Sequence, residues 1–119
     1  MLRPAVLALG GLALLVSTPA DAGPDGRAAT THKVALRDFH FSPVRTSAEP
    51  GDVIRFKWRG EYAHTVKFTK APKHASKPRS CKLRVSGTCL REVAKRGLYR
   101  YKCTIHGDSY GMRGRIEVE

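Results

Sequence analysis

The most informative part of this chain is the stretch Tyr99-Arg-Tyr-Lys-Cys103-Thr-Ile-His106-Gly-Asp-Ser-Tyr-Gly-Met112-Arg-Gly114. Up to Cys103, apolar residues alternate with Arg and Lys, which is the period of a half-buried β-strand. The chain then turns within three residues to His106, and Met112 follows just before a second alternating stretch. One loop between two strands can therefore bring a thiolate, an imidazole and a thioether to a single point.

A second imidazole comes from a separate strand-like stretch. His64 shares the parity of Val66 and Phe68, so its side chain is expected to point inward. Two imidazoles, one thiolate and a weak thioether form the trigonal set that copper adopts in electron-transfer sites. The sequence therefore predicts one mononuclear copper ion bound by His64, Cys103, His106 and Met112.

These residues also allow other interpretations. Met112 on its own could be a core residue, and zinc accepts one cysteine and two histidines, although a thioether is a poor zinc ligand. A Cys–His pair can support nucleophilic catalysis, but no third orienting group accompanies Cys103 and His106. The remaining histidines lie among polar or charged neighbours and are expected at the surface: His32, His40 and His74.

Residues 1–22 have the pattern of a secretory signal peptide. Arg3 precedes an apolar stretch from Val6 to Val16, and Ala20-Asp21-Ala22 matches a cleavage site. The apolar stretch is shorter than the roughly 20 residues that a membrane helix needs, so export with cleavage is favoured over a retained anchor. We therefore expect an exported protein that is periplasmic, extracellular or located at the cell envelope. We expect no transmembrane segment after cleavage.

The remainder of the chain predicts one all-β domain. Residues 23–32 form a small polar leader that we expect to be flexible, and residues 33–119 contain seven or eight short strands without a helical period. This pattern favours a β-sandwich. Residues 82–94 are expected to form a hairpin, and Cys81 and Cys89 are candidates for a disulfide across it in an oxidising compartment.

The charge is strongly basic. The chain has 22 Lys and Arg residues against 10 Asp and Glu residues, which gives a net charge of +12. Such a charge permits nucleic-acid binding, but no motif concentrates it and an exported protein rarely meets nucleic acid. We therefore expect no nucleic-acid partner. Electrostatic steering toward an acidic redox protein, or toward an anionic cell surface, is expected instead, while a role in solubility alone stays open. The basic run 70–79 is expected to be a solvated loop.

These motifs together resemble the cupredoxin family of small blue copper proteins, which includes plastocyanin, pseudoazurin and amicyanin. The resemblance covers about residues 33–119 and rests on these motifs in order: Phe39-x-Phe41-x-Pro43, Pro50-Gly-Asp52, His64-Thr-Val66, Gly97-x-Tyr-x-Tyr-x-Cys103-x-x-His106 and Gly111-Met112-x-Gly114-x-Ile-x-Val118. It implies a Greek-key β-sandwich with one type 1 copper ion at one end, and one-electron transfer without catalysis.

Two departures from the family pattern concern the ligand loops. Thr65 stands where many relatives have Asn, and its hydroxyl is expected to tie the two ligand segments together more weakly. Ile105 stands where several relatives have Pro, so it retains a backbone N–H. If that N–H points at the Cys103 sulfur, it stabilises the thiolate and raises the reduction potential.

The resemblance implies a monomeric carrier of single electrons between larger redox partners. The edge of His106 would then lie near the surface, with an apolar rim formed by Ala63, Tyr110 and Gly111. A copper-binding protein for delivery, buffering or sensing is the alternative. A domain of a multicopper oxidase or nitrite reductase is disfavoured, because the sequence has no His-x-His pair for further copper ions.

Overall fold

The computed structural model describes residues 26–119, which form nine β-strands and no helix. The predicted signal peptide, residues 1–22, and residues 23–25 of the leader lie outside the described residues. Within the described residues, no helix is long and apolar enough to cross a membrane.

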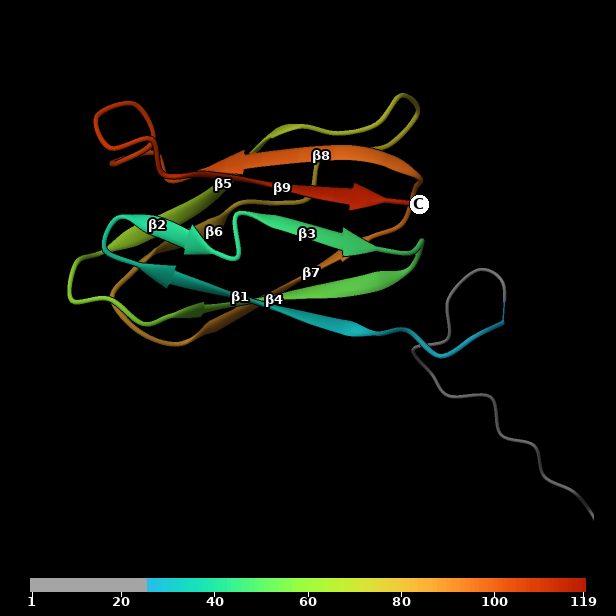
Figure 1. Cartoon of the computed structure of the whole chain (residues 1–119), viewed down its shortest axis with the longest axis horizontal. Coiled ribbons are helices and arrows are strands. Elements are labelled where there is room, and N and C mark those ends of the chain that lie inside the picture. The colour runs from blue at the N-terminus through green and yellow to red at the C-terminus, as the bar shows by residue number, and fades with distance from the viewer. Residues whose placement is uncertain (1–25) are drawn as a thin grey trace, which may run out of the picture.

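The strands form two sheets that pack face to face (Figure 1). The first sheet has, in spatial order, β2 (His40–Ser42), β1 (Thr31–Arg37), β4 (Asp52–Trp58) and β7 (Thr88–Val93). The second has β3 (Arg45–Ala48), β9 (Arg113–Val118), β8 (Gly97–Lys102), β5 (His64–Lys70) and β6 (Cys81–Arg84). β1 pairs with β4 and β3 pairs with β9 in parallel. The predicted all-β sandwich is confirmed, with nine strands in place of seven or eight.

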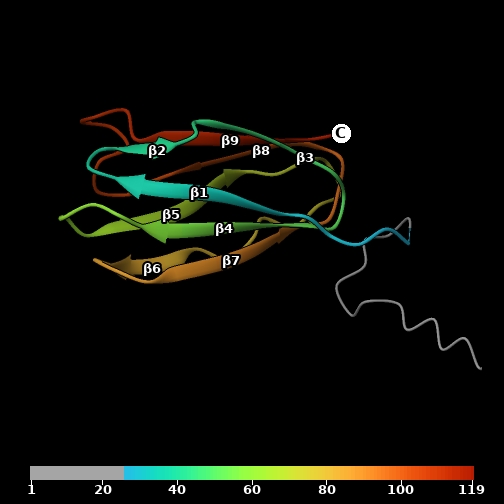
Figure 2. The same cartoon turned by 60° about the horizontal axis from the view of Figure 1, so that its bottom comes forward.

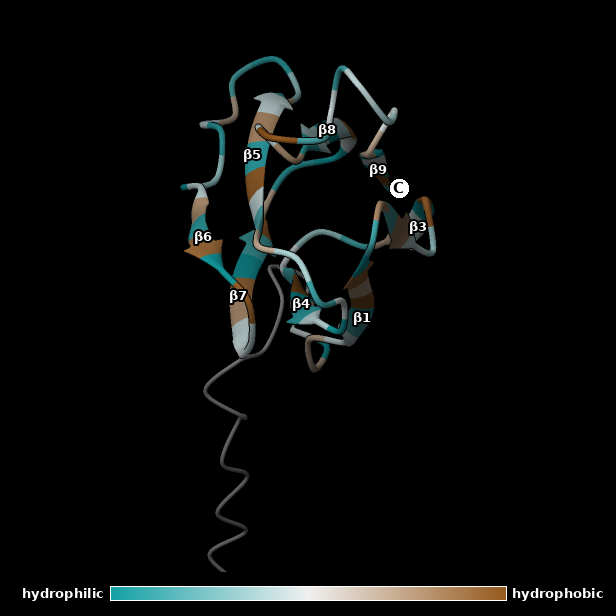
Figure 3. Ribbon diagram, turned by 90° about the vertical axis from the view of Figure 1, so that its left-hand side faces the viewer, coloured by the Kyte–Doolittle hydropathy of each residue, from teal (hydrophilic) through white to brown (hydrophobic). Residues whose placement is uncertain are grey.

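Side-chain alternation explains how the strands face each other. Along β4, Ile54, Phe56 and Trp58 are buried while the intervening residues are half-buried. The same alternation appears as brown and teal bands along β5 in Figure 3. Burial of each large apolar side chain contributes roughly 1.5–3 kcal/mol, and a register slip by one residue would reverse every side chain. This alternation therefore also directs His64, at the start of β5, toward the interior.

The first strand begins earlier than the predicted domain boundary at residue 33. β1 starts at Thr31, where the sequence predicted the leader, and it pairs with Val53 of β4. Before it, Arg27 forms ion pairs with Asp52 and Glu49, each at 2.7 Å. Long-range contacts to a buried carboxylate, which no local pattern reports, thus hold residues 27–32 against the sandwich.

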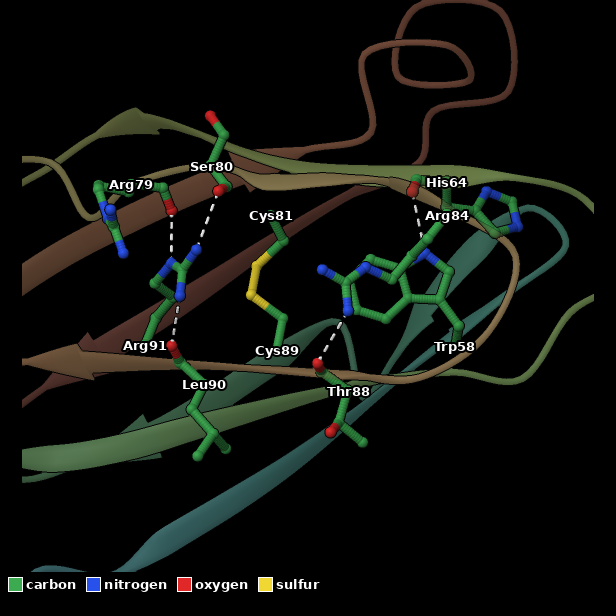
Figure 4. The surroundings of a disulfide bond; sticks show 10 residues. All are labelled: Trp58, His64, Arg79, Ser80, Cys81, Arg84, Thr88, Cys89, Leu90 and Arg91. Atoms are coloured by element: carbon green, nitrogen blue, oxygen red, sulfur yellow. Dashed lines mark hydrogen bonds between the residues drawn. A yellow bond between two sulfur atoms is a disulfide. The ribbon is translucent and has the colours of Figure 1, made fainter.

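The predicted hairpin over 82–94 is wrong, because β6 and β7 belong to different sheets. Cys81 lies opposite Val66 of β5, whereas Cys89 lies opposite Phe56 of β4. The chain crosses between the sheets at Gly87, whose φ of 103° suits glycine. The predicted Cys81–Cys89 disulfide is confirmed, and Figure 4 shows it between β6 and β7. These two strands are edge strands of the two sheets and lie side by side in Figure 2.

The candidate ligands lie in or beside connections that meet at one end of the sandwich. The β1–β2 turn, the β4–β5 loop and the β8–β9 loop all lie at the left-hand end in Figure 1. The pairing of the strands requires this, since β1 and β4 run in parallel and β8 ends where β9 begins. Residues far apart in the sequence are thereby brought around one point.

Candidate metal centre

Three of the four predicted ligands converge at this end of the sandwich. The ligand atoms of His64, Cys103 and His106 all lie within 4.8 Å of one another. The two Nδ1 atoms are 3.1 Å apart, and the Cys103 sulfur lies 3.9 Å from Nδ1 of His64 and 3.6 Å from Nδ1 of His106. The residues are 0%, 0% and 8% exposed, respectively, so the cluster is nearly closed to solvent.

The spacing of these three atoms fits a single metal ion. Bonds of roughly 2.0–2.3 Å to nitrogen and sulfur, arranged in a triangle, separate the donor atoms by roughly 3.5–3.7 Å. The observed separations of 3.1, 3.6 and 3.9 Å bracket that range. A soft thiolate combined with two imidazoles is a donor set that suits copper in both of its common oxidation states.

Backbone hydrogen bonds hold the ligand loop closed. Gly107 N–H donates to the Cys103 carbonyl at 2.7 Å, and a Cβ at Gly107 would lie 2.5 Å from the same oxygen. Cys103 N–H donates to the Met112 carbonyl at 3.1 Å, while Met112 N–H donates to the His106 carbonyl at 3.2 Å. Met112 is fully buried, and its backbone is therefore tied to both of the ligand residues of its own loop.

The predicted link through Thr65 is confirmed. The backbone N–H of Thr104 donates to the Thr65 hydroxyl at 2.8 Å, and the two threonine hydroxyls are also 2.8 Å apart. The condition stated for Ile105 is not met, since its N–H makes no hydrogen bond to the Cys103 sulfur in the described part of the chain. The Thr65 hydroxyl approaches that sulfur instead, at 4.0 Å.

His64 is held through both its backbone and its ring. The indole N–H of Trp58 donates to the His64 carbonyl at 2.9 Å, and the Arg84 guanidinium lies over the indole ring at 5.1 Å, as Figure 4 shows. On the ring, Nε2 lies 2.7 Å from Oδ1 of Asp38 in the β1–β2 turn. Nδ1 is the nitrogen that remains to face Cys103 and His106.

Asp38 is a site residue that the sequence did not reveal. Besides His64, it accepts hydrogen bonds from the N–H groups of Glu61 at 2.7 Å and Tyr62 at 3.1 Å. The bond from Glu61 lowers the pKa of the Asp38 carboxyl; partial burial opposes this shift, and the bond to His64 adds to it. A lone acidic residue in a turn has no spacing that would have connected it with His64.

Aromatic side chains surround the outer edge of His106 and form an aromatic rim, defined as Phe39, Tyr62 and Tyr110. The Phe39 ring stacks on Tyr110 at 4.4 Å and contacts His106 edge-on at 4.7 Å and Tyr62 at 5.2 Å. Tyr62 and Tyr110 are 57% and 61% exposed. Of the predicted rim, Tyr110 and Gly111 are exposed and Ala63 is half-buried, whereas Phe39 and Tyr62 were missed.

The environment also affects protonation of His106. Burial lowers the pKa of its imidazole, the neighbouring His64 lowers it further, and Asp38 opposes the shift. A lowered pKa favours the neutral ring, which is the form that binds a metal ion.

The other histidines lie away from this cluster. His40 and His74 are exposed, as predicted. His32 differs from the prediction, because it is half-buried and its Nε2 lies 2.8 Å from Oδ2 of Asp52. Asp52 lies at the start of β4, at the opposite end of the sandwich, so His32 takes no part in the metal centre.

Comparisons with solved structures find the same fold. Plastocyanin from Dryopteris crassirhizoma aligns over 74% of this chain and 100% of its own, with 25% identity and a TM-score of 0.64. Pseudoazurin from Methylobacterium extorquens AM1 aligns over 74% of each chain, with 26% identity and a TM-score of 0.59. Pseudoazurin from Hyphomicrobium denitrificans aligns over 75% of each chain, with 22% identity and a TM-score of 0.63.

A comparison with curated proteins finds no match. The model of the family of copper binding proteins, plastocyanin/azurin family, matches residues 28–119, which include every residue of the metal centre. Both the donor atoms and the family therefore indicate that the cofactor is copper. The chain belongs to the plastocyanin/azurin family of copper-binding proteins, the cupredoxins.

Proposed function

We propose that this chain is an exported, monomeric type 1 copper protein that carries single electrons between larger redox partners and catalyses no reaction of its own. The observation that carries the proposal is the buried convergence of His64 Nδ1, Cys103 Sγ and His106 Nδ1 within 4.8 Å. Met112 completes the set as the weak axial ligand. Its burial and its backbone bonds to Cys103 and His106 support that role.

The protein's part in electron transfer is to keep these ligands still. A bound copper ion supplies the one-electron couple, because it alternates between two oxidation states. Cys103 and His64 are attached directly to paired strands, and the Thr65–Thr104 hydrogen bond joins their segments. Ligands held in this way rearrange little when the charge of the ion changes, which favours rapid exchange of an electron.

The aromatic rim supports an electron port at His106. His106 is 8% exposed, and aromatic side chains pack against its ring. A partner that covers Tyr62 and Tyr110 would exclude water from the path to the ion. Basic residues near the rim, including Arg37 and Arg59, are exposed and would attract an acidic partner.

Export is supported by the N-terminal sequence, which lies outside the described residues, and by the Cys81–Cys89 disulfide. Disulfides persist in oxidising compartments such as the periplasm and the extracellular space. The alternative role, copper delivery or buffering, requires an ion that exchanges readily. The burial of His64 and Cys103 favours retention of the ion and therefore the carrier.

The decisive experiment is visible absorption and EPR of the purified protein after addition of Cu(II). We expect an intense blue charge-transfer band with small copper hyperfine splitting, lost in Cys103→Ala and retained in the exposed control His40→Ala. A pale, ordinary Cu(II) spectrum in the wild-type protein would overturn the proposal. Rapid loss of copper to a chelator during repeated redox cycles would favour delivery instead.

Steering by charge is tested with small redox reagents. Oxidation of the reduced protein by anionic hexacyanoferrate(III) is expected to slow steeply as the ionic strength rises, because salt screens exposed charges beyond about 10 Å at 0.1 M. A cationic cobalt complex should show the opposite trend. Equal salt dependence for both reagents would remove the acidic-partner part of the proposal and leave the electron-carrier part intact.

A further inference from the structure

The metal centre contains a carboxylate that the ligand set does not account for. Asp38 lies 26 residues before His64, yet its Oδ1 is 2.7 Å from Nε2 of that ring, on the side away from Cys103 and His106. Its side chain is 21% exposed, so solvent only partly screens the carboxylate. This contact joins the β1–β2 turn to the ligand at the start of β5.

We propose that Asp38 is a positioning residue of the copper centre, which orients His64 and favours the oxidised ion over the reduced one. This inference rests on the proposed copper site and adds a determinant of its redox balance. Under this proposal, Asp38 sets the orientation of the His64 ring and the balance between Cu(II) and Cu(I), although it does not bind the ion itself.

The hydrogen bonds determine the orientation of the ring. A carboxylate accepts, so in the neutral ring of His64 the proton lies on Nε2 and Nδ1 presents its lone pair. Asp38 cannot turn away easily, because Glu61 N–H and Tyr62 N–H also donate to it. The β4–β5 loop therefore holds the carboxylate, and the carboxylate holds the ring.

Gly60 makes room for this arrangement. A Cβ at Gly60 would overlap the carboxylate of Asp38, so any larger residue would displace it. Gly60 also donates its N–H to the carbonyl of Leu36 at 3.1 Å, which brings the loop close to the end of β1. Substitution of Gly60 is therefore a second way to move the carboxylate while its charge is retained.

The charge of Asp38 determines the direction of the redox effect. A carboxylate bonded to a metal-bound imidazole makes the ring a stronger donor. A negative charge also stabilises a dication more than a monocation at the same place. Both effects favour Cu(II), so removing the charge should raise the reduction potential.

The main test compares Asp38→Asn with Glu61→Gln. Glu61 is an exposed residue of the same loop whose backbone N–H contacts Asp38, so both variants remove one negative charge from the same region. We expect Asp38→Asn to lower the ratio of Cu(II) to Cu(I) affinity about tenfold, which is ~59 mV for one electron. Glu61→Gln should produce less than about a third of that shift. Equal potentials for the two variants would overturn the inference.

A second readout needs no copper. In long-range ¹H–¹⁵N spectra of the metal-free protein, His64 is expected to be protonated at Nε2 in the wild type and to become a mixture of tautomers in Asp38→Ala. Gly60→Ala should shift the same signals and also raise the potential, and it replaces Asp38→Ala if that variant does not fold. Unchanged His64 signals in the folded variant would overturn the orienting role.

The outcomes separate this inference from the proposed function. A wild-type protein without the blue band contradicts the electron carrier, and the tautomer measurement then decides the orienting role of Asp38 by itself. A wild-type protein with the blue band, whose potential is the same in Asp38→Asn and Glu61→Gln, contradicts this inference alone.

Discussion

Among residues 26–119, the sandwich contains two carboxylate–histidine pairs, one at each end, and we infer that the same chemistry serves different purposes in them. Asp38 contacts His64 at 2.7 Å beside the candidate copper ligands, and Asp52 contacts His32 at 2.8 Å where β1 and β4 begin. In each pair the carboxylate also accepts backbone N–H groups from a neighbouring segment. The distances alone do not distinguish them.

The pairs differ in what lies beyond the carboxylate and the ring. Arg27 contacts Asp52 at 2.7 Å, so the negative charge of this 2% exposed residue is balanced within the fold. Asp38 has the imidazole of His64 on one side, with the other candidate ligands Cys103 and His106 beyond it. A carboxylate balanced by arginine is a structural clamp, whereas one balanced through a ligand histidine can act on a metal ion.

Asp52→Asn should have the larger effect on stability. Burial opposes ionisation of Asp52, but hydrogen bonds from Thr30, His32, Glu49 and Arg27 outweigh it and keep the pKa of the carboxyl well below its usual value. Removing one partner from a buried ion pair costs about 3 kcal/mol of unfolding free energy. Urea unfolding should show this loss with an unchanged copper spectrum, whereas Asp38→Asn should be milder in stability and change the potential.

The pH dependence of the free energy of unfolding provides a second test of the clamp role of Asp52. A carboxyl with a lowered pKa in the folded state contributes stability above its unfolded pKa of about 3.9, and this stability is lost as the pH falls toward the folded value. Wild-type stability should therefore fall as the pH drops below about 4. Asp52→Asn should show a much shallower fall, and equal slopes would contradict the clamp role of Asp52.

Loss of the Cys81–Cys89 disulfide should have the next largest effect on the free energy of unfolding. Replacing Cys81 and Cys89 together by Ala leaves Cys103 in place and removes a link between the sheet edges. For so short a loop, the chain-entropy estimate is about 2.5 kcal/mol. Because the disulfide does not contact Asp52, its loss should add to that of Asp52→Asn in the combined variant. A changed blue band would show that the metal centre depends on this link.

The smallest expected effect on the free energy of unfolding comes from Thr65→Val, beside the metal centre. Thr65→Val removes the acceptor of the Thr104 N–H and should cost about 1 kcal/mol. It should also speed copper release to a chelator, because the two ligand segments lose their link. Thr69→Val, an exposed residue of the same strand, is the control and should change neither quantity. Equal release rates would show that the strands alone hold the site.

Much of the fold and the ligand set could be predicted from the sequence. Strand alternation placed Phe56, Trp58 and Val66 inside the sandwich, and the same parity placed His64 with them. The spacing of Cys103 and His106 on one turn required no tertiary information. The basic loop over 70–79 is largely exposed, as its composition predicted.

The residues that were missed have partners distant in the chain. Phe39 and Tyr62 join the aromatic rim through the meeting of two loops, and Asp38 reaches His64 across 26 residues. The assignment of β6 and β7 to different sheets could not be predicted for the same reason. Alternation indicates which face of a strand is buried, but it does not indicate which strand lies beside it.

The all-β architecture, the types of candidate ligand and the candidate cysteine pair could be inferred from the sequence, because backbone periodicity and side-chain chemistry are local properties of the chain. The contacts that distinguish Asp38, beside His64, from Asp52, beside Arg27, appear only in the folded chain. The role of a carboxylate depends on the charges that folding places around it, and no local pattern contains that information.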